Sequence, residues 1–176
     1  MKRIVLLLCF LSCIAEARAE EITSVDIKEL YAALSYDWDG DGKRDHAFLV
    51  AGDKGDADLL LVTSRGQDMR LREFAIAGGM LTRPWLELNE ANSLVVIQGN
   101  EAIGRNRWES RTVIAFREGQ FVVAGYDYVA RDTLDLDFNL SYSANYLTGK
   151  VIRNGIEKKV DSKPVPLTEW EPPNNL

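Results

Sequence analysis

Apolar and polar positions in this chain form short alternating runs, and long stretches with apolar residues at helical spacing are not evident. Gly, Asn and Asp separate the apolar runs at intervals of roughly ten residues, which is the spacing of antiparallel strands. We therefore predict an all-β fold, an antiparallel meander of about seven to nine strands arranged as a propeller-like fold, a barrel or a sandwich. The clearest candidate strands are residues 46–51, 58–63, 72–75, 85–89, 93–98, 107–116 and 121–128.

Turn residues refine this prediction. Residues 117–120 contain Gly119, which can adopt the positive φ of a tight hairpin turn. Residues 89–92 connect the candidate strands at 85–89 and 93–98 in the same way. Upstream, residues 22–34 fit either one amphipathic helix or an irregular first strand. At the other end, four prolines after residue 163 predict an irregular tail.

The N-terminus has the order of a secretory signal peptide. A basic end is followed by an apolar run from Ile4 to Ala15 and by Ala17-Arg18-Ala19, a small-x-small cleavage site. We expect cleavage after Ala19, export to the periplasm or medium, and one mature domain over residues 20–176. The apolar run is shorter than the roughly 20 residues of a membrane span, so we expect no transmembrane segment. One alternative is a lipid anchor on Cys13, because residues 10–13 loosely resemble a lipoprotein cleavage box.

Composition narrows the classes of partner. The two cysteines, Cys9 and Cys13, both lie in the predicted signal, so the mature chain has no thiol for a disulfide, a metal or a nucleophile. Removing residues 1–19 changes the net charge from −6 to −8, because 18 Lys and Arg then face 26 Asp and Glu. Such an acidic surface disfavours nucleic acid, whose phosphates bind Lys and Arg. It suits a basic partner, or it simply keeps the protein in solution.

Catalytic residue types are scarce. His46 is the only histidine, whereas a catalytic triad needs a nucleophile with a positioned base and a zinc site draws on several His or Cys ligands. A glycosidase pair of carboxylates can come from anywhere in a chain, so the sequence selects none. We therefore predict that the protein is not an enzyme, and we assign no catalytic residue.

The most specific motif is the segment 37–45, Asp-Trp-Asp-Gly-Asp-Gly-Lys-Arg-Asp. Calcium takes about six to eight oxygen ligands, and carboxylates at alternate positions turn toward one centre while a glycine allows the bend. We predict one Ca²⁺, held by the side chains of Asp37, Asp39, Asp41 and Asp45 and by the backbone carbonyl of Lys43. The alternative is a solvated acidic turn that binds no ion.

This loop departs from an EF-hand, which places a glutamate at its twelfth position. Here that position is Phe48, and a strand-like run begins directly after Asp45. A DxDxDG loop that runs straight into a strand resembles the calcium loops of FG-GAP and VCBS-type β-repeats. In those families the ion ties a β-turn to its strand.

Residues 121–128 and 139–150, taken together with the loop, resemble small periplasmic β-proteins that include inhibitors of invertebrate-type lysozyme and related immunity proteins. Those inhibitors insert a Ser-Gly-x-Tyr loop into the lysozyme cleft. The matching positions here are Ser143-Ala144-Asn145-Tyr146, with alanine in place of glycine. The resemblance implies that Ser143 and Tyr146 bind a lysozyme-like glycoside hydrolase.

Three function classes follow from these observations. An inhibitor or other protein-binding module predicts an exposed loop at Ser143 to Tyr146. A calcium-stabilised structural or envelope-maintenance protein predicts that this segment is buried, with Tyr142 and Tyr146 as core or cross-strand aromatics. A hydrolase requires a cleft with two facing carboxylates roughly 5 to 9.5 Å apart.

Overall fold

The computed structural model describes residues 26–77 and 82–174. The predicted signal peptide, residues 1–19, lies outside these ranges, and so do its cleavage site after Ala19 and the alternative lipid position Cys13. Within the described ranges, no helix has the length and hydropathy needed to cross a membrane.

The fold is all-β, as predicted, and the described residues form twelve strands and one short 3-10 helix. The strands are β1 (Leu30–Tyr36), β2 (Asp45–Ala51), β3 (Asp56–Val62), β4 (Met69–Ile76), β5 (Thr82–Leu88), β6 (Leu94–Asn100), β7 (Asn106–Arg117), β8 (Gln120–Asp132), β9 (Asn139–Asn145), β10 (Lys150–Arg153), β11 (Ile156–Lys159) and β12 (Val165–Pro166). The 3-10 helix η1 covers Leu167–Glu169. The strand count exceeds the expected seven to nine because residues 139–166 add four short strands to the sheet.

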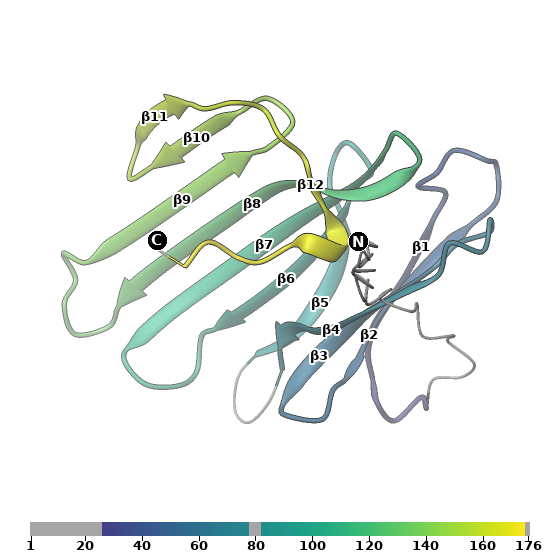
Figure 1. Cartoon of the computed structure of the whole chain (residues 1–176). Coiled ribbons are helices and arrows are strands. Elements are labelled where there is room, and N and C mark those ends of the chain that lie inside the picture. The colour runs from purple at the N-terminus through teal and green to yellow at the C-terminus, as the bar shows by residue number, and fades with distance from the viewer. Residues whose placement is uncertain (1–25, 78–81, 175–176) are drawn as a thin grey trace, which may run out of the picture.

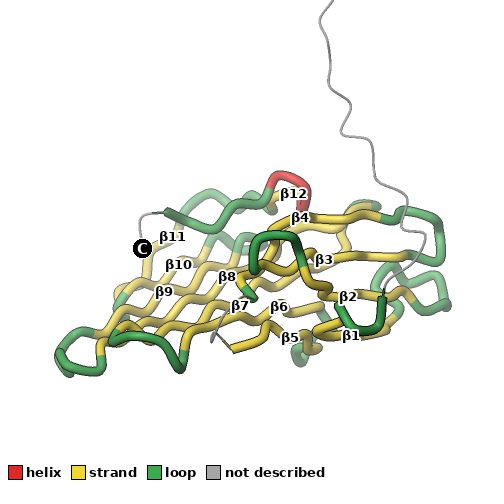
Figure 2. The backbone as a smooth tube through the Cα atoms, turned by 90° about the horizontal axis from the view of Figure 1, so that it is seen from below, coloured by secondary structure: helices red, strands yellow, loops and turns green. Residues whose placement is uncertain are grey.

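The strands form two antiparallel meanders (Figure 1). Strands β1 to β4 make a four-stranded sheet, and β5 to β11 make a larger sheet in which β12 pairs with β8. Figure 2 shows β1 next to β5 at the edge where the two sheets meet, and these strands are in contact. Of the three predicted architectures, this arrangement is nearest to a sandwich, and the described strands do not close into a barrel.

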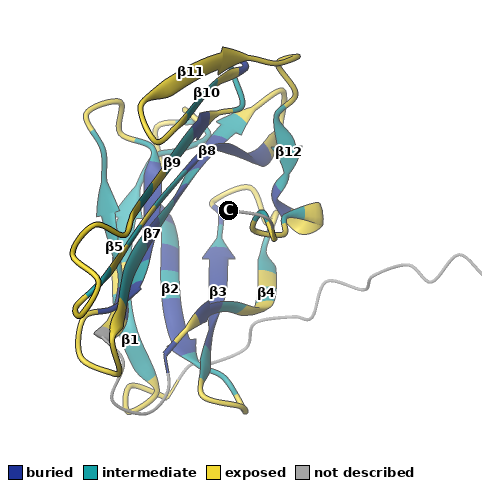
Figure 3. Cartoon of the chain, turned by 90° about the vertical axis from the view of Figure 1, so that its left-hand side faces the viewer, coloured by how far each residue is buried: buried dark blue, intermediate teal, exposed yellow. Residues whose placement is uncertain are grey.

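The core lies between the two sheets because alternate side chains of each strand point inward. Leu94 and Ile114 from the large sheet are fully buried against Leu49 and Leu59 from the small one. Figure 3 shows the buried segments of β2 and β3 facing the large sheet. The first strand, β1, begins at Leu30, which selects the strand alternative for the described part of residues 22–34.

The C-terminal segment, predicted to be an irregular tail, contains β12 and η1 and is packed on the large sheet. Leu167 is buried in the core, and the Trp170 ring lies 5.5 Å from that of Tyr126 and 5.8 Å from that of Tyr146, measured between centroids. This packing covers part of the face of the large sheet that β1 to β4 leave free.

Candidate functional site

The predicted calcium loop is the connection between β1 and β2, whose ends are fixed by the pairing of Tyr36 with Asp45. Gly40 and Gly42 have φ angles of 71° and 85°, a region that favours glycine and allows the chain to reverse sharply. Trp38 packs against the hydrophobic core. The loop is therefore held at both ends and in its middle.

Three carboxylates of this loop converge. Each of Asp37, Asp39 and Asp45 has a side-chain oxygen that lies within 4.8 Å of the corresponding oxygens of the other two. The Asp45 residue and the Asp39 side chain are each only 1% exposed. Carboxylates gathered this closely and removed from water need a compensating cation or donors.

Backbone N–H groups orient the carboxylates of Asp45 and Asp37. Asp45 Oδ2 accepts hydrogen bonds from the amides of Trp38 (2.9 Å) and Asp39 (3.3 Å), and its Oδ1 accepts one from Ser64 (3.1 Å). Asp37 accepts from the amides of Asp41 and Gly42 at 3.1 and 2.9 Å. These bonds fix the two carboxylates before any ion binds.

The remaining two predicted ligands lie at the solvent side. Asp41 Oδ2 accepts a 2.6 Å hydrogen bond from Ser64 Oγ, and Asp41 Oδ1 accepts one from the Lys43 amide at 2.8 Å. The bond from Ser64, followed by the one from Lys43, lowers the pKa of Asp41 below its usual value. Asp41 therefore stands outside the group of three and must turn from Ser64 to join it. Lys43 is exposed, with its backbone in the bend.

Arg65 supplies the positive charge at this cluster. Its Nε lies 3.0 Å from Asp39 Oδ2 and 3.6 Å from Asp41 Oδ2. Asp39 Oδ2 is buried and has no hydrogen bond, so the contact with the half-exposed arginine is an ion pair without hydrogen-bond geometry. Sequence reasoning missed Ser64 and Arg65, which come from the β3–β4 connection and share no local pattern with residues 37–45.

Ser143 and Tyr146 do not form a protruding loop. Ser143 lies within β9, between Asp127 of β8 and Ile152 of β10. Tyr146 lies in the turn after β9, half-buried against the core and in ring contact with Trp170. Burial, as the main cause, raises the pKa of the Tyr146 hydroxyl. Ser143 is thus a cross-strand residue and Tyr146 a packed aromatic side chain. This is the geometry that the structural-protein alternative predicts for the segment.

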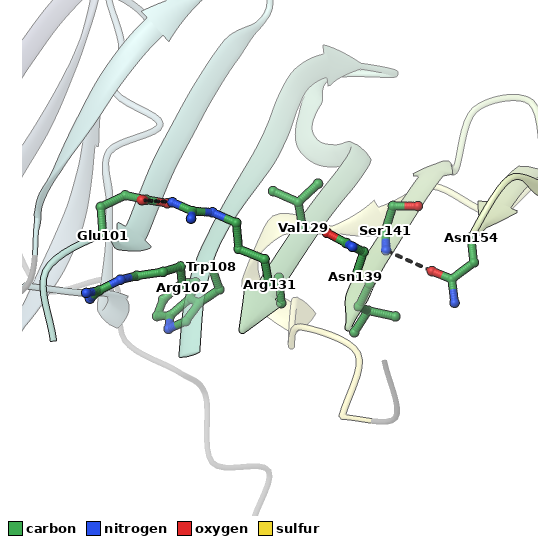
Figure 4. Close-up of a pocket in the computed structure, with 10 residues that line it drawn as sticks. Glu101, Arg107, Trp108, Val129, Arg131, Asn139, Ser141 and Asn154 are labelled. Atoms are coloured by element: carbon green, nitrogen blue, oxygen red, sulfur yellow. Dashed lines mark hydrogen bonds and ion pairs between the residues drawn. The ribbon is translucent and has the colours of Figure 1, made fainter. Parts of the chain in front are cut away.

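A hollow of about 380 Å³ lies on the large sheet where β7, β8 and β9 meet the loops at one end (Figure 4). Its lining includes Trp108, Val129 and Asn139, and Glu101 is the single carboxylate among the ten lining residues. Glu101 forms a 2.7 Å ion pair with Arg131. The hollow therefore offers no pair of facing carboxylates.

His46 has a structural environment. Its Nδ1 lies 2.7 Å from Ser35 Oγ on the neighbouring strand, and its ring stacks on Phe48 at 6.2 Å between centroids. Both contacts lie within β1 and β2.

Comparison of the chain with protein-family models, with curated proteins and with solved structures found no match. Its function is therefore inferred from its own residues.

Proposed function

We propose that the chain is an exported, calcium-stabilised domain that acts as a protein-binding module, with a lysozyme-like peptidoglycan hydrolase as its partner. The observation that carries the calcium part of the proposal is the convergence of Asp37, Asp39 and Asp45 in one tight loop. Three hard oxygen donors in this arrangement suit Ca²⁺, which also accepts backbone carbonyls and water.

The ion would compensate the negative charge of the clustered carboxylates, which Arg65 does only for Asp39 and Asp41. Asp37, Asp39 and Asp45 would hold it from the strand side, while Asp41 and the Lys43 carbonyl would approach from the solvent side. Because Asp45 starts β2 and Asp37 follows β1, an ion at this point would fasten the first hairpin. A ligand that binds only the folded state adds its binding free energy to stability.

The acidic charge of the mature chain supports the protein-binding part, since opposite charge speeds and orients association with a basic partner. A second candidate is a calcium-stabilised structural or envelope-maintenance protein with no enzyme partner. The half-buried packing of Tyr146 against Trp170 favours it, because this tyrosine is unsuited to insertion into a cleft. Binding to a basic lysozyme separates the two candidates.

Thermal unfolding of residues 20–176 tests the calcium site. After chelation, 10 mM Ca²⁺ should stabilise the fold by about 1.4 kcal/mol if the dissociation constant is about 10⁻³ M. For a domain of this size that is a rise in Tm of roughly 3 to 5 °C. The Asp39→Ala, Asp41→Ala double variant should lose the rise.

Two controls make this result specific. The same concentration of Mg²⁺ should give a smaller shift, because Mg²⁺ demands a stricter octahedral site. The Asp135→Ala, Asp137→Ala variant removes two carboxylates from a different loop and should keep the calcium response. An equal calcium response in both double variants would refute the site.

A further inference from the structure

Exposed apolar side chains gather at one end of the large sheet. Six of the nine large apolar side chains that are exposed in the described part of the chain lie there. We call this group the loop edge; it consists of Ile103, Val129, Leu134, Leu136, Phe138 and Ile156. The β6–β7, β8–β9 and β10–β11 connections that carry most of it all emerge on the same side of the sheet (Figure 1).

The β8–β9 connection is the centre of the loop edge. Leu134, Leu136 and Phe138 are 76%, 80% and 47% exposed and alternate with Asp135 and Asp137. Side chains this exposed contribute little to the core. Clustered apolar exposure of this kind marks an interaction surface.

Hydrogen bonds hold this connection in place. Asp132 Oδ1 accepts from the amides of Leu134 (2.8 Å) and Asp135 (3.2 Å). The Thr133 amide donates to the carbonyl of Arg105 at 2.9 Å, and the Arg105 side chain pairs with Asp132 at 2.5 Å. The β6–β7 and β8–β9 loops are thus tied together. A surface ordered in advance loses less conformational entropy when it binds.

The second loop is braced by one buried side chain. Asn100 Oδ1 accepts from the Ile103 amide at 2.8 Å, and its Nδ2 donates to the carbonyls of Ile103 and Asn106, both at 2.8 Å. This network holds the backbone of Ile103 beside the β8–β9 loop and leaves the Ile103 side chain exposed.

The charge at the loop edge points to the chemistry of a partner. Residues 132–139 contain three aspartates and no Lys or Arg. Of the arginines at the neighbouring strand ends, Arg105 and Arg131 are neutralised by Asp132 and Glu101. Arg107 and Arg153 lie on β7 and β10, outside the β8–β9 connection itself. Asp135 and Asp137 therefore present negative charge next to the exposed leucines.

We propose that the loop edge docks on a basic protein, with Leu134 and Leu136 entering an apolar recess and Asp135 and Asp137 meeting Lys or Arg at its rim. Carboxylates beside the apolar anchors disfavour both an anionic membrane and a second copy of this acidic chain. This inference rests on the proposed role as a module that binds a lysozyme-like hydrolase, but it does not depend on the calcium loop.

The test uses residues 20–176 and purified basic lysozymes as the probe, with binding followed by surface plasmon resonance. The Leu134→Ser, Leu136→Ser double variant should weaken binding at least tenfold, mainly through faster dissociation. The Asp135→Asn, Asp137→Asn variant should slow association and reduce its salt dependence. Ile27→Ser, an equally exposed apolar position in the turn before β1 of the small sheet, should leave binding unchanged.

Each outcome decides a separate point. Lysozyme binding that survives the double leucine variant overturns the loop edge as the docking surface but keeps the proposed function. An absence of binding by the wild-type chain overturns the proposed partner and this inference with it. Dimers in sedimentation, or binding to phosphatidylglycerol vesicles, that disappear in the leucine variant would overturn the inference and assign the loop edge to a different occupant.

Discussion

Two aspartate-rich connections in this fold use the same residue type in opposite ways. In the β1–β2 loop, the carboxylates of Asp39 and Asp45 are buried and Trp38 packs into the core. In the β8–β9 loop, Asp132 accepts two backbone amides and Asp135 accepts one, while Leu134 and Leu136 are exposed. One loop concentrates negative charge inward, and the other presents apolar groups and negative charge outward.

The difference follows from what each loop can pack against. The β1–β2 loop lies beside the turn at residues 91–93 and the end of β7 at residues 115–117, so the Trp38 side chain packs against the core. The β8–β9 loop extends past the end of the large sheet (Figure 2), where the small sheet does not reach. Similar local composition therefore gathers carboxylates against the core in one place and leaves apolar and acidic side chains exposed in the other.

The largest expected effect is that of removing the Asp45 carboxylate, which tests the contrast between the two loops. In chelator, Asp45→Ala should lower the free energy of unfolding by about 3 kcal/mol, because three backbone N–H donors lose their acceptor inside a closed site. The matched substitution Asp135→Ala should cost less than about 0.5 kcal/mol, as exposed positions do. Urea denaturation of both variants measures the difference, and equal losses would contradict the contrast between the loops.

A smaller effect is expected from removing the Arg65 side chain, and it would define the role of this residue beside the carboxylates. Without calcium, Arg65→Ala should cost about 0.5 kcal/mol, since its ion pairs are half-exposed. With calcium, the same variant should show a larger rise in Tm than the wild type, because no arginine competes with the ion for Asp39. A calcium titration followed by thermal unfolding checks this. A smaller rise would mean that Arg65 supports the bound ion.

The smallest effect concerns the acid sensitivity of the β8–β9 loop. The backbone bond from Leu134 and then the Arg105 side chain lower the pKa of Asp132 below 3.8. A carboxyl with a depressed folded-state pKa stabilises at pH values above its unfolded pKa, and this support is lost as pH falls through the folded value. Amide exchange at Leu134 should therefore be slow at pH 5 and lose its protection as pH falls below 3.8.

The Asp132→Asn variant is the control for this titration. It keeps an acceptor for the Leu134 amide but carries no charge, so its protection should show no acid transition in this range. A transition of the same size in the variant would assign the effect to another group.

Much of the fold was predictable because its information is local. Each of the seven predicted strands overlaps one of β2 to β8, and Gly119 has the expected positive φ of 82° in the β7–β8 turn. Strands β9 to β11 were missed because their outward positions are polar and β11 is fully exposed, so residues 139–159 resemble a loop. Their strand character comes from pairing with β8, which a local pattern does not reveal.

The candidate site also has features that the local sequence predicts and features that it does not. The convergence of Asp37, Asp39 and Asp45 was predictable from their alternate spacing before a strand, whereas the calcium ion itself remains a prediction. Ser64 and Arg65 were not predictable, because they reach the loop only through the β3–β4 connection. Ser143 and Tyr146 were chosen from a four-residue likeness, which carried no information about the packing of Trp170.

The sequential strand order also bears on how the chain folds. In both sheets each strand pairs with its neighbours along the sequence, and the pairing of β12 with β8 is the one departure among the described strands. Such a topology has a lower contact order than Greek-key β-proteins, so loop closure costs less entropy at each step. Because β1 to β4 precede β5 to β11 along the sequence, a chain that emerges N-terminus first during synthesis can complete its first sheet before its second has appeared.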